Sequence, residues 1–158
     1  MTPHGIVTRA ALADAEELDR NLRPEDRAEL EDISGASALD CLRRSVLFGD
    51  PAYTLRTHSG ELVGIVSVAP VSYLHGAIAM SGTPAIERVS TAFLRGSRDV
   101  LADIERRFDT LLNVCDARNE VHHRWLKWLG FTFIRKIDSF GPRGVPVYEF
   151  ARISNQHV

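Results

Sequence analysis

The sequence predicts a mixed α/β fold in one domain that spans residues 1–158. The run from Ile104 to Phe131 has the pattern of a helix end, a buried strand, a polar turn, a second helix and a Gly-Phe stop. The other expected elements place an antiparallel meander before a parallel strand–helix–strand crossover. A chain of 158 residues, 44% hydrophobic and 25% charged, is also large enough to bury a core without disulfides.

The run from Ile104 to Phe131 carries the clearest local signals. Thr110–Ala117 is mostly apolar, which is typical of a strand covered on both faces. Asp116 and Asn119 then supply short polar side chains where the next helix needs an N-cap. Apolar residues follow at positions i, i+4, i+7 and i+8 of that helix: Val121, Trp125, Trp128 and Leu129. We therefore expect a helix that packs one face on the sheet.

The remaining elements follow from capping, breaking and periodicity signals. Helices are expected at Asp14 to about Leu22 (with Asp14 and Glu17 as a capping box), from Pro24 to Ser34, from the Ser37 cap to Leu47, and from Ser90 or Thr91 to about Phe108. Strands are expected at Ile6–Thr8, Tyr53–Thr57, Leu62–Ala69, Pro84–Val89, Phe131–Asp138 and Val145–Phe150. Pro70–Thr83 is either a loop or a weak strand, and 154–158 is a frayed tail.

Charge and composition exclude some classes of function. The chain carries 19 basic and 21 acidic residues, a net charge of −2, which gives no general attraction to nucleic acid or anionic membranes. No apolar run is long enough to cross a bilayer, and the N-terminus lacks the pattern of a signal peptide. Cys41 and Cys115 are expected to be reduced, packed thiols. We expect a protein of the cytoplasm with neither nucleic acid nor membrane as a partner.

The spacing from Asn119 through Gly130-Phe131 resembles the C-terminal half of the GNAT N-acetyltransferase fold. Within that half, the segment NEVHHRWLKWLGF, preceded by LLNVCDARN, resembles a narrower group. This group is a phage GNAT-like family that includes an internal virion protein of short-tailed phages. The resemblance covers about the last two thirds of the chain. It implies a GNAT-like acyl-CoA N-acyltransferase fold, an antiparallel meander plus a parallel crossover, in a protein of the virion or the host cytoplasm.

The resemblance also implies where acetyl-CoA and the catalytic groups would lie. In this fold acetyl-CoA occupies a gap between the fourth and fifth strands, with its pyrophosphate on backbone N–H groups at the start of the long helix. The expected cofactor-binding residues are Val89, Ser90, Thr91, Phe93, Arg95 and Asn119. Glu87, placed on the fourth strand, is the expected general base, and Tyr148 is the nearest tyrosine by topology.

Two positions depart from the family pattern. Thr91 and Phe93 stand where the pyrophosphate loop has glycine and glycine or alanine, and a Phe side chain there would crowd a phosphate. Leu126 stands where active members often carry a tyrosine that protonates the CoA thiolate. These departures favour a catalytically degenerate protein that acts through contacts with other virion proteins, or with copies of itself. The alternative is an N-acetyltransferase that transfers acetyl from acetyl-CoA to an amine of a small molecule or protein.

Other constellations have plainer interpretations. His122 and His123 are adjacent on a helix, so their side chains point about 100° apart, and no metal site is expected. Cys115 with Asp116 and His122 would resemble a thiol nucleophile and its base, but a cysteine on a buried strand is more often packing. Trp125 and Trp128 are expected in the core, with an interface anchor as the alternative.

Overall fold

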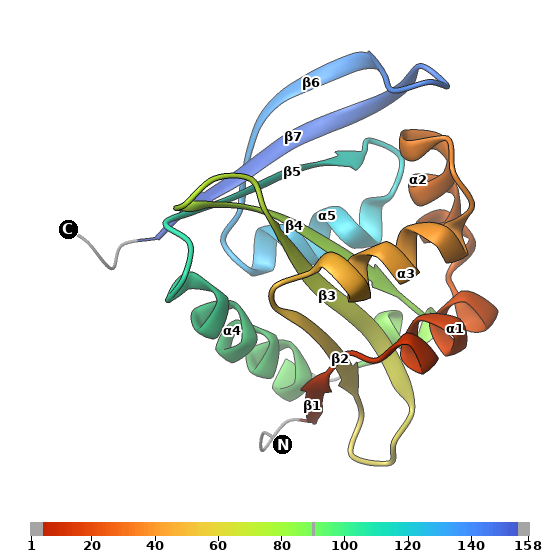
Figure 1. Ribbon diagram of the computed structural model, residues 1–158, viewed down its shortest axis with the longest axis vertical. Helices are drawn as coiled ribbons and strands as arrows, with labels where there is room; N and C mark the ends of the chain where they lie inside the picture. The colour runs from red at the N-terminus through yellow and green to blue at the C-terminus, as the bar shows by residue number, and fades with distance from the viewer. Residues whose placement is uncertain (1–4, 90, 155–158) are drawn as a thin grey trace.

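The computed structural model describes residues 5–89 and 91–154 (Figure 1). Its strands are β1 (Ile6–Arg9), β2 (Ala52–Arg56), β3 (Leu62–Pro70), β4 (His75–Gly82), β5 (Thr110–Asp116), β6 (Thr132–Phe140) and β7 (Val145–Ile153). Its helices are α1 (Leu12–Asn21), α2 (Pro24–Ser34), α3 (Ala38–Phe48), the 3₁₀ helix η1 (Pro84–Glu87), α4 (Thr91–Glu105) and α5 (Glu120–Trp128).

All seven of these strands form one sheet in the order β1-β2-β3-β4-β5-β7-β6. The β1–β2, β2–β3 and β3–β4 pairs are antiparallel, and β4 pairs with β5 in parallel through the α4 crossover. Strand β7 inserts between β5 and β6, antiparallel to both. The predicted mixed α/β class, a meander followed by a parallel crossover, is confirmed.

Helices α1 and α3 lie on one face of the sheet and α4 and α5 on the other (Figure 1), and an apolar cluster lies on each face. The larger one joins α4 and α5 to the strands, and Ile104, Leu126 and Phe150 are almost fully buried there. The smaller one joins α1 and α3 to β3 through Leu18 and Leu42. The core stripes predicted for the long helix and for the helix after Asn119 are therefore confirmed. Among the described residues, no helix is long and apolar enough to cross a membrane.

The fourth strand lies earlier in the chain than the sequence predicts. Strand β4 is His75–Gly82, which lies inside Pro70–Thr83, the segment for which the sequence predicts either a loop or a weak strand. The predicted strand Pro84–Val89 is wrong. The Thr83 side chain caps η1 there by accepting from the Ala85 N–H, and Pro84 starts its first turn. A proline at a first helical position favours this short helix over a central strand.

Two helices also differ in detail from the prediction. Helix α1 begins at Leu12 with Ala11 as its N-cap, so Asp14 is at position N3 and its carboxylate accepts from the Ala11 N–H at 2.9 Å. Helix α2, whose sequence predicts burial of little beyond Ala28 and Leu30, instead buries Asp26 and Glu29 and leaves Ala28 exposed. The reason is that the inner side of α2 meets polar strand ends instead of an apolar surface.

Candidate functional site

Strands β4 and β5 pair at one end and part at the other. Their parallel register runs from His75–Thr110 to Ala77–Leu112 and stops there. At the boundary, the Asn113 side-chain amide donates to the Ile78 carbonyl at 2.8 Å. Because main-chain groups alternate along a strand, the N–H and C=O of Met80 face the same opening as the Ile78 carbonyl and the Gly82 N–H.

Helix α2 supplies two buried carboxylates to the far ends of these strands. Asp26 accepts the Gly82 N–H of β4 at 2.8 Å, and Glu29 accepts the Asp116 N–H of β5 at 2.6 Å. Residues three apart lie on the same face of a helix, so one face of α2 reaches both strands. The two carboxylates thus satisfy backbone donors that a paired strand would otherwise satisfy.

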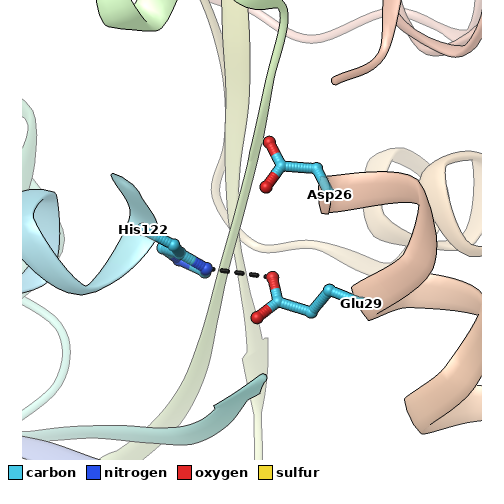
Figure 2. Close-up of side chains that lie close together, drawn as sticks. All are labelled: Asp26, Glu29 and His122. Atoms are coloured by element: carbon cyan, nitrogen blue, oxygen red, sulfur yellow. Dashed lines mark hydrogen bonds and ion pairs between the residues drawn. The ribbon is translucent and has the colours of Figure 1, made fainter. Parts of the chain in front are cut away.

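Helix α5 approaches the same place from the other side of β4 (Figure 2). Its N-cap Asn119 accepts from the His122 N–H and donates through its amide to Asp26 at 2.7 Å. His122 forms a hydrogen bond through Nδ1 with Glu29 Oε2 at 2.9 Å. Both side chains are buried, so α2 and α5 are joined through the opening between the two strands.

Arg23 completes a network that we call the strand-end cluster: Arg23, Asp26, Glu29, Asn119 and His122. Arg23 is only 3% exposed, and its guanidinium donates from Nη1 to Asp26 at 3.0 Å and to the Asn119 amide oxygen at 3.3 Å. Its backbone N–H donates to the Gly82 carbonyl at 3.0 Å. Buried charges are tolerated only when paired, and a guanidinium and an imidazolium here balance two carboxylates.

Burial and charge pull the pKa values of this cluster in opposite directions. Burial raises the pKa of Asp26, and the nearby His122, Asn119 and Arg23 offset only part of that increase. Burial lowers the pKa of His122, but the charge of Glu29, its hydrogen bond and the charge of Asp26 outweigh burial, so the pKa of His122 is raised. His122 is therefore favoured as an imidazolium with Nδ1–H donating to Glu29.

Two nitrogen atoms of the cluster remain without a partner. Among the described side chains, Arg23 Nε and His122 Nε2 are the buried polar atoms with no hydrogen bond. Both residues line one cavity of about 10 Å³, together with Met80 and Gly82 of β4 and Trp125 of α5. A buried unsatisfied donor is unfavourable, so this cavity suits an acceptor atom.

Three members of the cluster also have the residue types of a metal site. Ligand atoms of Asp26, Glu29 and His122 lie within 4.8 Å of one another. Both oxygens of each carboxylate, however, already face hydrogen-bond partners, and the Arg23 guanidinium lies 3.0 Å from Asp26. A second cation beside the guanidinium would be repelled, so a hydrogen-bonded ion network describes this geometry better than a cation site.

Side-chain contacts of two tryptophans join α4 and α5. Trp125 Nε1 donates to Ser97 Oγ at 3.4 Å, and Trp128 Nε1 donates to the Leu94 carbonyl at 3.2 Å. The Arg98 guanidinium lies 4.0 Å from the centre of the Trp128 ring. Both tryptophans belong to or pack on the larger core, as predicted.

The two residues predicted for catalysis lie apart. Glu87 is on η1 rather than on the fourth strand, half-exposed, and 3.3 Å from Arg23 Nη2 of the strand-end cluster. Tyr148 is on β7 opposite Cys115, half-buried, and its ring packs against those of Phe133 and His123. The structure brings Glu87, but not Tyr148, to the strand-end cluster.

The residues predicted to hold the cofactor are also spread out. Val89 and Phe93 line a groove of about 200 Å³ with Arg88 and His58, and Phe93 is buried. Thr91 begins α4, Arg95 is exposed, and Asn119 belongs to the strand-end cluster. Ser90 and the tail positions 155–158 lie outside the described residues, whereas Ser154 is buried and donates to the Asp109 carbonyl.

The structure also separates the residues of the two remaining candidate sites, the histidine pair and the Cys115 group. His123 bonds through Nε2 to the Asp116 carbonyl at 2.7 Å, away from the His122–Glu29 pair. Burial raises the pKa of Cys115 to about 12, which disfavours a thiolate nucleophile. Sequence reasoning missed Arg23, Asp26 and Glu29. The available signal was a pair of acidic residues at i, i+3 in a helix without an apolar stripe.

Solved structures with the same architecture cover nearly the whole chain. An acetyltransferase of the GNAT family from Bacillus anthracis has a TM-score of 0.71 at 10% identity, over 97% of this chain and 96% of that chain. An acetyl transferase from Salmonella typhimurium that modifies the N-terminal serine of ribosomal protein L7/L12 has a TM-score of 0.72 at 13% identity, over 98% and 97%.

A ribosomal L7/L12 α-N-protein acetyltransferase solved in complex with coenzyme A has a TM-score of 0.66 at 13% identity, over 96% of this chain and 95% of that chain. The chain has the GNAT fold. Strands β4 and β5 are the fourth and fifth strands of the chain. The place where they separate therefore corresponds to the gap expected from the sequence resemblance. No protein-family model and no curated protein matches the sequence.

Proposed function

We propose that the chain is an N-acetyltransferase that takes acetyl-CoA and acetylates an amine of a small molecule or protein. The observation that carries this proposal is the parting of β4 and β5 after Ala77 and Leu112, which leaves the Met80 N–H facing an opening between parallel strands. An edge N–H in a water-poor opening is suited to stabilise charge on an acyl oxygen. The solved GNAT-fold acetyltransferases support the proposal at the level of the fold.

The residues fit the reactive end of acetyl-CoA once the α4–α5 interface separates. Donors face the opening, and the groove beside the start of α4 carries His58 and Arg88. A phosphate group there would have to replace Glu61, which lines the same groove and pairs with Arg88 at 2.9 Å.

The hydrogen bonds of Trp125 with Ser97 and of Trp128 with the Leu94 carbonyl hold α4 and α5 together. Each hydrogen bond contributes about 1 kcal/mol. Both tryptophans also belong to or pack on the larger core, so binding must offset the loss of this apolar burial as well.

The chemistry assigns a role to each group near the opening. Acetyl-CoA supplies an acetyl group activated as a thioester. The Met80 N–H donates to the acyl oxygen and so favours attack at the acyl carbon. Glu87, held by Arg23, accepts a proton from the acceptor amine through water as the new C–N bond forms. The departing sulfur takes its proton from water, because Leu126 has none to give.

A titration of acetyl-CoA into the protein tests this function. Both tryptophans lie at the α4–α5 interface, so intrinsic fluorescence reports directly on its opening. We expect calorimetric binding together with a fluorescence change. Arg98→Ala removes the cation over Trp128 and should bind acetyl-CoA more tightly. Arg106→Ala, which removes an exposed arginine directly after α4, should bind as the wild type does. No heat at millimolar acetyl-CoA would overturn the proposal.

A second candidate is a catalytically degenerate component of a phage virion that acts through protein contacts. It is favoured by the strand-end cluster and closed interface at the opening, and by the resemblance of Asn119–Phe131 to phage GNAT-like proteins. The turn after β3 exposes Tyr73 at 93% and Val71 at 62%, as a contact surface would. Mass spectrometry of purified phage particles tests it: the candidate requires the protein in the particle.

A further inference from the structure

The cavity beside the strand-end cluster presents donors without an acceptor. Arg23 Nε and His122 Nε2 are buried, lack a partner among the described residues, and belong to residues that line the same space of about 10 Å³. That volume holds one atom of the size of an oxygen. The cavity also touches Met80, whose N–H faces the opening.

Both unpartnered nitrogens act as donors. A guanidinium has no acceptor atom, so Arg23 Nε can only donate. His122 uses Nδ1 for Glu29, and its pKa is raised by the carboxylates of Glu29 and Asp26 against the opposing effect of burial. In the imidazolium form both ring nitrogens donate, which makes Nε2 a second donor toward the cavity.

The acidic members of the cluster do not meet this demand. Asp26 also lines the cavity, but its Oδ1 accepts from Arg23 Nη1 and Asn119, and its Oδ2 accepts from Gly82. Glu29 is committed to His122 Nδ1 and the Asp116 N–H. The cavity therefore needs an oxygen from outside the cluster.

We propose that this cavity receives the carbonyl oxygen of an acyl thioester, with Arg23 and His122 as catalytic donors beside the Met80 N–H. The inference rests on the proposed acetyltransferase function and adds to it a side-chain oxyanion pocket. As the amine attacks, the C=O electron pair moves onto this oxygen, and two positively charged donors stabilise the developing charge. When the C–S bond breaks, the pair returns to re-form the carbonyl.

The position of Trp125 gives the acyl group a route to this pocket. Trp125 and Met80 line both the polar cavity and a second, apolar cavity of about 10 Å³ between α4, α5 and the sheet. A rotation of the Trp125 side chain that breaks its hydrogen bond with Ser97 is needed to join the two spaces. The acyl group would then pass along β4 from apolar surroundings to the paired donors.

A comparison of two ligands tests the pocket in the intact protein. Acetyl-CoA and S-ethyl-coenzyme A differ only in that a methylene replaces the carbonyl. We expect calorimetry to give the wild type a Kd about tenfold or more lower for acetyl-CoA, because charged hydrogen bonds to the oxygen are lost with the thioether. Infrared spectra of ¹³C-labelled acetyl-CoA should show the carbonyl band shifted to lower wavenumber on binding.

Two substitutions of His122 distinguish loss of the donor in the pocket from general damage to the fold. In His122→Asn the side-chain amide can still donate to Glu29 from the place of Nδ1 but leaves the place of Nε2 without a donor, so the preference for acetyl-CoA should fall severalfold. His122→Gln can place an amide donor near the Nε2 position and should restore part of the preference. If both variants fail to fold, Arg23→Lys, which keeps a cation beside Asp26 but removes Nε, should still reduce the wild-type infrared shift, whereas an unchanged shift would leave the Met80 N–H as the donor and overturn the pocket.

The outcomes distinguish this inference from the proposed function. Equal Kd values for the two ligands in the wild type, with no infrared shift, would overturn the oxyanion pocket and leave acetyl-CoA binding in place. That result would assign the cavity to a buried water. Failure of both ligands to bind would overturn the pocket and the proposed function together.

Discussion

The two ends of the β4–β5 pair are held by different kinds of bond. At the closed end, from His75–Thr110 to Ala77–Leu112, backbone pairs with backbone. At the open end, the Gly82 and Asp116 N–H groups donate to carboxylates of α2. A backbone ladder tolerates changes of side chain, whereas the open end depends on five buried polar side chains. One strand pair therefore has an end that is insensitive to side-chain changes and an end whose stability depends on substitution and protonation of the strand-end cluster.

The largest effect is expected from removing the carboxylate shared by β5 and α5. Glu29→Ala leaves the His122 imidazolium and the Asp116 N–H without their acceptor, and loss of one partner of a buried ion pair costs about 3–5 kcal/mol of unfolding free energy. Urea denaturation at pH 6 measures this loss. Glu25→Ala, an exposed carboxylate of the same helix that contacts Arg23 only at 3.4 Å, is the control and should cost under about 1 kcal/mol. Equal losses in the two variants would contradict the role of the open end.

The second effect is a pH dependence confined to the open end. His122 faces Glu29 and Asp26 of α2 and the Arg23 guanidinium, and its folded pKa is raised above the ordinary value of 6.5. Its charged interactions therefore stabilise the fold in full below pH 6.5, and that contribution is lost as the pH rises through the folded pKa. Urea midpoints of the wild type and His122→Asn from pH 5.5 to 9 should converge as the pH rises. A gap that stays constant would mean that His122 does not change its charge between pH 5.5 and 9, which would contradict this prediction.

The smallest effect is expected at the boundary between the two ends. Asn113→Ala removes the amide that donates to the Ile78 carbonyl at 2.8 Å, a loss of about 1 kcal/mol of unfolding free energy. Asn21→Ala, at the exposed end of α1 with a bond to the Glu17 carbonyl, should change stability by less than about 0.5 kcal/mol. A change at Asn113 no larger than at Asn21 would show that the strands part without help from this side chain.

The sequence predicted the elements whose signals are local. Asn119 caps α5 as expected, and the apolar positions after it pack on the core. Strand β4 was missed because its residues are small: Gly76, Ala77, Ala79, Ser81 and Gly82 have little strand propensity. Packing explains Gly76, since a Cβ at this position would lie 2.4 Å from a methyl group of Val68.

The strand-end cluster could not be predicted from local sequence patterns, for a different reason. Its acidic members read as a solvated helix face, because charged residues are seldom fully buried. Their hydrogen-bond partners are distant in the sequence: Gly82 is 56 residues from Asp26, and His122 is 93 residues from Glu29. Only the topology, which brings α2 and α5 to the same strand ends, turns an acidic helix into the support of a parallel pair.

The long separation between these partners also sets an order of events in folding. The closed end needs only β4, α4 and β5, which are neighbours in the chain, whereas the bond between Glu29 and Asp116 spans 87 residues. Closing so long a loop costs entropy before any bond forms, so distant contacts tend to form late. In refolding followed by amide hydrogen exchange, the Gly82 and Asp116 amides would gain protection after the amides of the β4–β5 ladder, and the open end would be the last part of this sheet to become rigid.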